Sequence, residues 1–167
     1  MSPLSAIKRM VFGVNHNLKT SIEGVVFIQS FEGFSFDSYL CPAGKWTIGW
    51  GSTRGITKDM TVTREAATRM FLDDLKNCEN DVKELVKVRL SQCQFDALVS
   101  FVYNCGPTSL RVSTLLKALN TGDYVSVPLQ LARWVKIKDK FGNHVASAGL
   151  IRRRKAEGAI FSNGIYK

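Results

Sequence analysis

The stretch EGFSFDSYLCPAGKWTIGWG, residues 32–51, decides the fold because it interrupts a chain that otherwise has helical spacing. Aromatic and β-branched residues such as Tyr39, Trp46 and Ile48 favour strands, and a proline and several glycines separate them. The pattern predicts a small antiparallel sheet of two or three strands within residues 34–57. Such a sheet is too small to form a domain core alone, so the helices must supply one.

Helices are predicted on both sides of this sheet. Upstream, Thr20-Ser21-Ile22-Glu23 has the form of a capping box, which predicts a helix from Ser21 to about Phe31, stopped by Gly33. Glu32 then lies at the helix end. Downstream, apolar spacing and further caps predict helices at about Arg64–Lys87, from Ser91 to near Gly106, at about Ser109–Asn120, from Val125 or Pro128 to Val135, and at about Ala148–Phe161.

The order of these elements predicts one mostly helical α+β domain over residues 1–167. Residues 1–19 show no sustained period and are interpreted as a flanking segment. A sheet lobe is expected at about 34–60 and a helical lobe at about 88–162, with a long helix joining them. Phe141-Gly142-Asn143-His144 is predicted to be a turn, and Trp134 and Phe141 are expected to pack in the helical core.

The composition excludes several classes of protein. Hydrophobic residues make up 45% and charged residues 22% of the 167 residues, which argues against a disordered chain. The longest uninterrupted apolar run, Gly24 to Ile28, is far shorter than a membrane span needs. Charge interrupts the N-terminal apolar residues at Lys8 and Arg9, so no secretory signal peptide is predicted.

The formal net charge is +9, which favours a polyanionic partner such as nucleic acid, an anionic membrane or a bacterial wall polymer. An unspecialised basic surface explains the same charge equally well. The run Arg152-Arg153-Arg154-Lys155 points in several directions on a helix, so it makes a poor patch. We expect one buried, ion-paired arginine there and the others in solvent.

No metal site or cofactor is predicted. The four cysteines, Cys41, Cys78, Cys93 and Cys105, include no CxxC pair, and His16 and His144 are isolated. The last three cysteines are expected to be small buried residues, and the thiols are expected to be reduced.

The segment from Glu32 to Thr53 has the residues of a catalytic site. An acid at a helix end is followed nine residues later by Cys41 and six residues after that by Thr47. A carboxylic acid beside aromatic surface can hold the proton that a leaving sugar oxygen needs. A thiol and a hydroxyl can orient water from the other side, and tryptophans suit sugar faces. On spacing alone, a glutamate at a helix end is more often a solvated or salt-bridged surface residue.

Four ordered blocks resemble the phage-type lysozymes of glycoside hydrolase family 24. The pattern Glu, eight residues, Asp or Cys, five residues, Thr is matched by Glu32, Cys41 and Thr47. The other blocks are residues 94–106, 113–120 and 149–157, the last similar to the family's Gly-Leu-x-x-Arg-Arg-x-x-Glu. Together the blocks cover about residues 22–162 and imply a lysozyme-like fold.

The resemblance implies roles for individual residues. Glu32 is expected to be the general acid, with Cys41 and Thr47 placing or activating water. Arg153 is expected to reach Glu32. Tyr39, Tyr103 and Asn104 are expected, with Arg153, to bind substrate.

The activity implied is that of an endolysin, a muramidase that cuts the β-1,4 bond between N-acetylmuramic acid and N-acetylglucosamine in peptidoglycan. The expected enzyme is a cofactor-free monomer, without a nucleic-acid partner or a stable membrane span. It would accumulate in the host cytoplasm, or be carried in the virion, and reach the wall after membrane permeabilisation. The alternative is a weak or inactive relative that binds wall glycan or disrupts the envelope by charge.

Cys41 departs from the family members that have Asp at this position. A free thiol is mostly neutral at pH 7, whereas Asp is anionic, so electrostatic stabilisation of the transition state should be weaker. The sequence also allows a disulfide that would remove Cys41 from catalysis, although a reduced, unpaired Cys41 is favoured.

Overall fold

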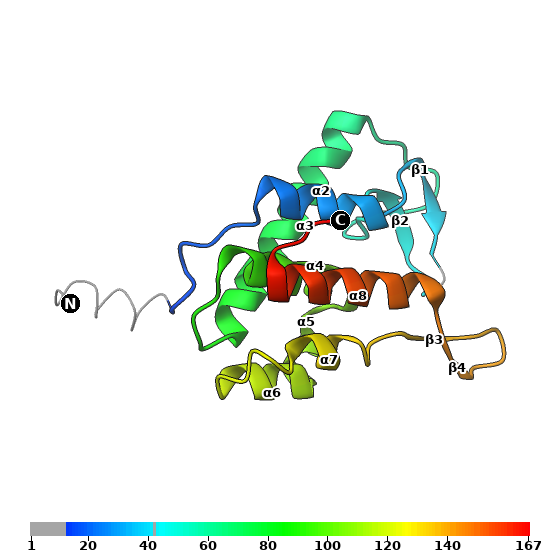
Figure 1. Ribbon diagram of the computed structural model, residues 1–167. Helices are drawn as coiled ribbons and strands as arrows, with labels where there is room; N and C mark the ends of the chain where they lie inside the picture. The colour runs from blue at the N-terminus through cyan, green and yellow to red at the C-terminus, as the bar shows by residue number, and fades with distance from the viewer. Residues whose placement is uncertain (1–12, 42) are drawn as a thin grey trace.

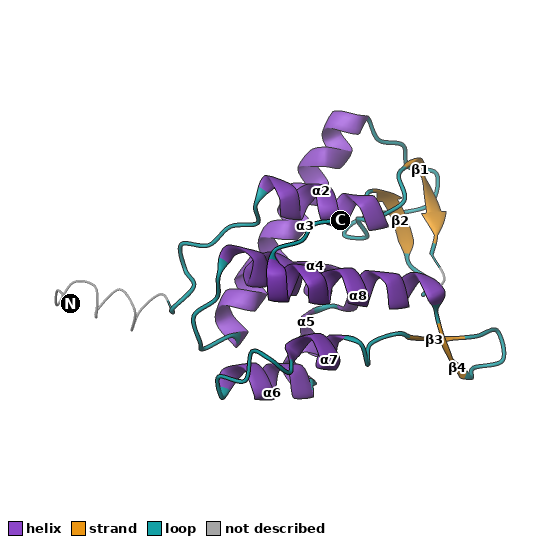
Figure 2. Cartoon of the chain, in the orientation of Figure 1, coloured by secondary structure: helices purple, strands orange, loops and turns teal. Residues whose placement is uncertain are grey.

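The computed structural model describes residues 13–41 and 43–167, and Figures 1 and 2 show a group of packed helices with both small sheets on the same side. The elements are α2 (Ile22–Phe31), β1 (Ser35–Leu40), β2 (Trp46–Gly49), α3 (Arg64–Leu85), α4 (Gln92–Cys105), α5 (Pro107–Val112), α6 (Thr114–Asn120), α7 (Val127–Leu131), β3 (Lys136–Lys138), β4 (His144–Ala146) and α8 (Ala148–Asn163). Among the described residues, no helix is both long and apolar enough to cross a bilayer.

Helix α2 begins one residue later than the capping box predicts. The hydroxyl of Ser21, not of Thr20, accepts from the backbone N–H of Gly24, because Ser21 also donates to the buried carboxylate of Asp96 at 2.6 Å. The helix ends because Glu32 is extended, at φ −93° and ψ 129°. The helix thus ends just before Gly33, as predicted, although Gly33 is not among the glycines with positive φ.

Strands β1 and β2 form the predicted antiparallel sheet. Tyr39 pairs with Thr47 and Leu40 with Trp46, and the register shifts between Ser35 and Tyr39. Strand β2 is buried from Thr47 to Gly49, whereas β1 is largely exposed. Strand β2 is therefore the strand that packs against the helices, and it contacts α3.

The first turn of α3 connects this sheet to the helices. The guanidinium of Arg64 lies 4.2 Å from the centre of the Phe34 ring, and Phe34 packs edge-on against Trp50. Helix α3 confirms the predicted long helix, ends at Leu85 and is about 33 Å long. One side of it, including Phe71 and Leu75, is buried.

Helix α4 is the centre of the core. Its capping box at Ser91 and Gln94 forms as predicted, and it is buried at every position from Phe95 to Val102. It packs against α2, α3, α5 and α8. The last turn of α4, which carries Tyr103 and Asn104, therefore belongs to a helix that packs against both α2 and α8.

The single helix expected at about 109–120 is two helices. Ser113 is extended, donates to Leu110 O at 2.7 Å and accepts from Leu116 N, so it ends α5 and begins α6. Helix α5 begins at Pro107, where the missing N–H costs nothing. Helix α7 ends at Leu131, four residues earlier than predicted.

Strands β3 and β4 were not predicted. They form a hairpin around the predicted turn, and its tip residue Phe141 is 76% exposed. The prediction that Phe141 packs in the core was therefore wrong. Trp134 does pack there, with its ring 5.4 Å from that of Phe101.

Part of the predicted flanking segment is anchored to the helices. Asn15 is buried, donates to Val88 O at 2.9 Å and accepts from Leu90 N at 3.0 Å. These bonds fix residues 13–19 to the connection between α3 and α4. The rest of the segment, residues 1–12, lies outside the described residues.

Candidate active site

Glu32 lies at the C-terminal end of α2, with its side chain 19% exposed. Its Oε1 accepts from Nη1 of Arg153 at 2.6 Å, which confirms the predicted contact. Gly51 lies beside it: a Cβ at residue 51 would be 3.4 Å from Glu32 Oε2, and the φ of +96° is strained for any other residue. The carboxylate of Glu32 thus lies between the buried guanidinium of Arg153 and the backbone of Gly51.

A buried network holds Arg153. Its Nε donates to Glu157 Oε1 at 3.2 Å and its Nη2 to Ser100 O at 3.3 Å. Arg154 is buried as well, with its Nε 2.9 Å from Glu157 Oε2. Two arginines are therefore buried, not the one expected, because a single fully buried carboxylate serves both. Burial raises the pKa of Glu157, and both arginines oppose this effect.

Tyr103 and Asn104 reach the site from the last turn of α4. The hydroxyl of Tyr103 donates to Trp50 O at 2.9 Å, and burial raises its pKa. The side-chain oxygen of Asn104 accepts from Arg154 Nη2 at 2.8 Å. Since this oxygen is occupied, the amide NH₂ of Asn104 is the group left to bind a ligand.

A pocket of about 450 Å³ opens beside Glu32. It is lined by Ser30, Phe31, Glu32, Asn104, Ser147, Gly149, Leu150, Arg152 and Arg153. Ser147, Gly149 and Arg152 were not predicted as site residues. Two features of the sequence could have indicated these residues: Ser147 as the N-cap of α8, and the spacing of Arg153 and Glu157 on that helix. Because Arg153 contacts Glu32, the first turn of α8 lies next to Glu32.

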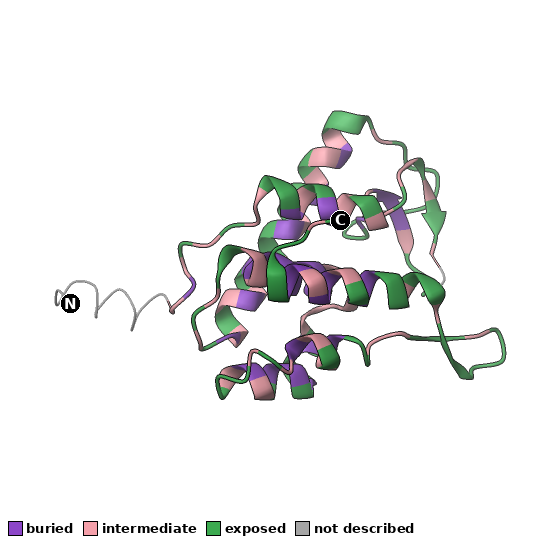
Figure 3. Ribbon diagram, in the orientation of Figure 1, coloured by how far each residue is buried: buried purple, intermediate pink, exposed green. Residues whose placement is uncertain are grey.

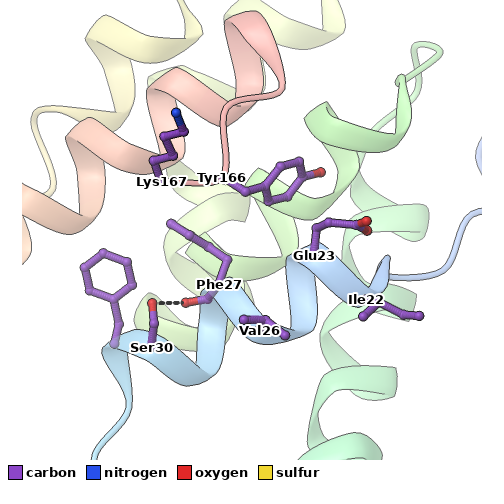
Figure 4. A pocket seen from close by; sticks show the side chains of 8 residues that line it. Ile22, Glu23, Val26, Phe27, Ser30, Tyr166 and Lys167 are labelled. Atoms are coloured by element: carbon purple, nitrogen blue, oxygen red, sulfur yellow. Dashed lines mark hydrogen bonds between the residues drawn. The ribbon is translucent and has the colours of Figure 1, made fainter.

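A groove of similar size lies over α2 but differs in character. Its lining includes the exposed Ile22 and Val26 from α2, with Tyr166 and Lys167 from the C-terminus (Figure 4). None of the residues predicted for catalysis lines it.

Cys41, Thr47 and Tyr39 lie together at the end of the sheet. Thr47 is buried and pairs with Tyr39 across the strands, and Cys41 N donates to Lys45 O in the connecting turn. Burial raises the pKa of Tyr39, and the charges of Cys41 and Glu32 raise it further. Tyr39, Cys41 and Thr47 do not line the pocket at Glu32, although the charge of Glu32 reaches the hydroxyl of Tyr39.

The environment of Cys41 favours its thiolate. The backbone N–H of Lys45 and then the hydroxyl of Thr47 hydrogen-bond to the sulfur, and they lower the pKa of Cys41 below that of a free thiol. Thr47 also donates to Lys45 O at 3.1 Å, so its one hydroxyl proton has two competing acceptors. All four cysteines are free, so Cys41 carries no disulfide.

We expect iodoacetamide to alkylate Cys41 before Cys78 and Cys105. Burial raises the pKa of Cys78 to about 12 and also raises that of Cys105, so both hold their protons at neutral pH. The alkylation rate of Cys41 should begin to rise at a lower pH than the rate of N-acetylcysteine. Peptide mass mapping across a pH series measures both rates. If alkylation of Cys41 and of N-acetylcysteine began to rise at the same pH, the prediction would be contradicted.

The two tryptophans near the sheet differ in their packing. Trp50 packs against the core and against Phe34, and Trp46 is half-buried on β2. Within the described part of the chain, no group of three or more His, Cys, Asp or Glu side chains is placed to hold a metal ion.

Known proteins are similar to this chain in sequence and in fold. The family profile described as Phage lysozyme matches residues 29–157. An endolysin of Acyrthosiphon pisum secondary endosymbiont phage 1 is 38% identical over 143 residues, which cover 86% of this chain and 97% of the relative.

Two solved structures have the same arrangement of elements. The endolysin from Escherichia coli O157:H7 phage FAHEc1 has a TM-score of 0.82 and 34% identity over 90% of this chain and 98% of its own. The muramidase domain of SpmX from Asticaccaulis excentricus has a TM-score of 0.81 and 35% identity over 88% and 99%. The predicted lysozyme-like α+β fold is confirmed, and the chain belongs to the phage lysozyme family of glycoside hydrolases.

Proposed function

We propose that this chain is an endolysin that hydrolyses the β-1,4 bond between N-acetylmuramic acid and N-acetylglucosamine in bacterial peptidoglycan. One observation carries the proposal: Glu32 lines a ligand-sized pocket and is held at 2.6 Å by the buried Arg153. A fixed acid at the edge of a pocket is the requirement for protonating a leaving sugar oxygen.

The other residues complete a division of roles. Glu32 protonates the glycosidic oxygen, while Cys41 and Thr47 place the attacking water. The lowered pKa of Cys41 supports a role for its thiolate form, which carries the negative charge that Asp supplies in other family members. Asn104 and Tyr39 contact the glycan, and Tyr103 holds the backbone at Trp50.

The same proposal covers the setting of the enzyme. Residues 1–167 act as one lysozyme-like domain and as a monomer. The net charge of +9 draws the protein to the anionic wall, more weakly as salt rises. The enzyme accumulates in the host cytoplasm or is carried in the virion, and it meets peptidoglycan once the membrane is permeable.

Tandem mass spectra of muropeptides released from purified sacculi test the bond that is cut, because fragmentation identifies the sugar at the reduced end. After borohydride reduction, a muramidase leaves fragments that end in reduced N-acetylmuramic acid. Fragments that end in reduced N-acetylglucosamine, or anhydro products that are lighter by one water, would contradict the proposal. Binding to sacculi without any released fragment would instead indicate an inactive relative, for which the cysteine at residue 41 is the only argument.

A further inference from the structure

The β3–β4 hairpin, residues 136–146, sorts its side chains by charge. The register places Lys136 and Lys138 opposite Ala146 and His144, so both lysines share one face with the histidine. Ile137 pairs with Val145 on the other face. All strand residues are exposed, and Figure 3 shows the hairpin standing away from the helices.

The tip of this basic hairpin, residues 139–143, is a hydrogen-bonded turn that carries one apolar side chain, Phe141. The carboxylate of Asp139 accepts from the backbone N–H groups of Phe141 at 2.8 Å and Asn143 at 2.9 Å. The one acid of the hairpin is thus used to shape the turn. Lys140 Nζ lies 5.0 Å from the centre of the Phe141 ring, and that ring is 76% exposed. An aromatic ring is therefore presented to solvent next to a cation.

Apolar surface continues from the base of the hairpin. A groove of about 430 Å³ between α7 and α8 is lined in part by Leu129, Val135 and Ile151, which precede and follow the hairpin in sequence. Leu129 is 74% and Ile151 48% exposed. The groove over α2 lacks this combination, because its lining includes an acid, Glu23, and only one lysine, Lys167 (Figure 4).

We propose that the basic hairpin binds the surface of a bilayer that contains anionic phospholipids. Lysines beside exposed apolar side chains match such a surface in two ways, because the headgroups attract the cations and the boundary below them accepts the ring of Phe141. Peptidoglycan offers carboxylates but no apolar phase that would cover Phe141, Ile137 and Val145. This binding goes beyond the proposed function and does not depend on glycan hydrolysis.

Vesicle flotation of the full chain tests the charge requirement. Binding to vesicles of equal parts phosphatidylglycerol and phosphatidylcholine, and not to phosphatidylcholine alone, is expected. Replacing Lys136, Lys138 and Lys140 together by glutamine should lower the partition coefficient about 100-fold. The matched control replaces three exposed lysines elsewhere, Lys58, Lys76 and Lys117, and should lower it less than about threefold. Unchanged binding of the hairpin variant, or an equal loss in the control, would overturn the proposal.

Phe141→Trp tests insertion of the tip. Its fluorescence should shift to shorter wavelength with anionic vesicles and stay unchanged with phosphatidylcholine vesicles; no shift with either would overturn the proposal. Hydrolysis of lipid-free sacculi by the lysine variant should stay within about twofold of wild type, since the hairpin does not line the pocket at Glu32. A loss of sacculus hydrolysis as large as the loss of vesicle binding would assign the hairpin to the wall and overturn the proposal.

Discussion

Replacing Glu32 by glutamine is expected to lower the rate of sacculus hydrolysis by about 10²- to 10⁴-fold, the usual contribution of a general acid. Glutamine has nearly the same shape and keeps an oxygen that accepts from Arg153 Nη1, so the contact seen at 2.6 Å has a replacement. It has no proton to give to the leaving oxygen. Dye release from labelled sacculi measures the rate, and thermal unfolding checks that the variant is folded.

Glu23→Gln is the matched control because it makes the same chemical change on the same helix. Glu23 lies in the first turn of α2 and is exposed, so its loss should change the rate by less than about twofold. A folded Glu32→Gln protein that keeps more than a tenth of the wild-type rate would remove Glu32 from the role of acid. Turbidity loss caused by charge alone would be the same in both variants.

Local patterns predicted most of the helices. The caps at Ser91 and the apolar spacing of α3 are signals that lie within one element, so they can be read without knowing the neighbours. The contact between Glu32 and Arg153 joins residues 121 positions apart, and only the resemblance to a family indicated it.

The errors came from contacts and exposures that apolar spacing does not encode. Ser21 replaces Thr20 as the cap because Asp96, on another helix, binds it. Ser113 ends a helix by bonding its own backbone neighbours, a choice that helical spacing does not reveal. Arg154 is buried because Glu157 accepts from both arginines. Phe141 was placed in the core on its hydrophobicity, although the turn that carries it points into solvent.

Replacing Arg153 by methionine is expected to lower the free energy of unfolding by about 3–5 kcal/mol, the usual cost of breaking a buried ion pair by removing one partner. Arg153 is 3% exposed and contacts Glu32, Glu157 and Ser100 at once. The fully buried Glu157 then keeps its contacts with Arg154 and with the hydroxyl of Ser100 but loses one of its two cations. For a chain of this length the melting temperature should fall by about 6–20 °C, measured by circular dichroism.

Arg152→Met is the control, because Arg152 is exposed on the same helix and its loss should change the free energy by less than about 0.5 kcal/mol. Arg153→Lys separates charge from geometry: one ammonium keeps the cation but lacks the planar fork that reaches both carboxylates. The lysine variant should therefore recover only part of the fall in melting temperature that methionine causes. A full recovery with lysine would mean that the charge alone stabilises the site. A fall of less than about 2 °C with methionine would show that Arg154 and Ser100 are enough to satisfy Glu157 and that Glu32 needs no partner to stay in place.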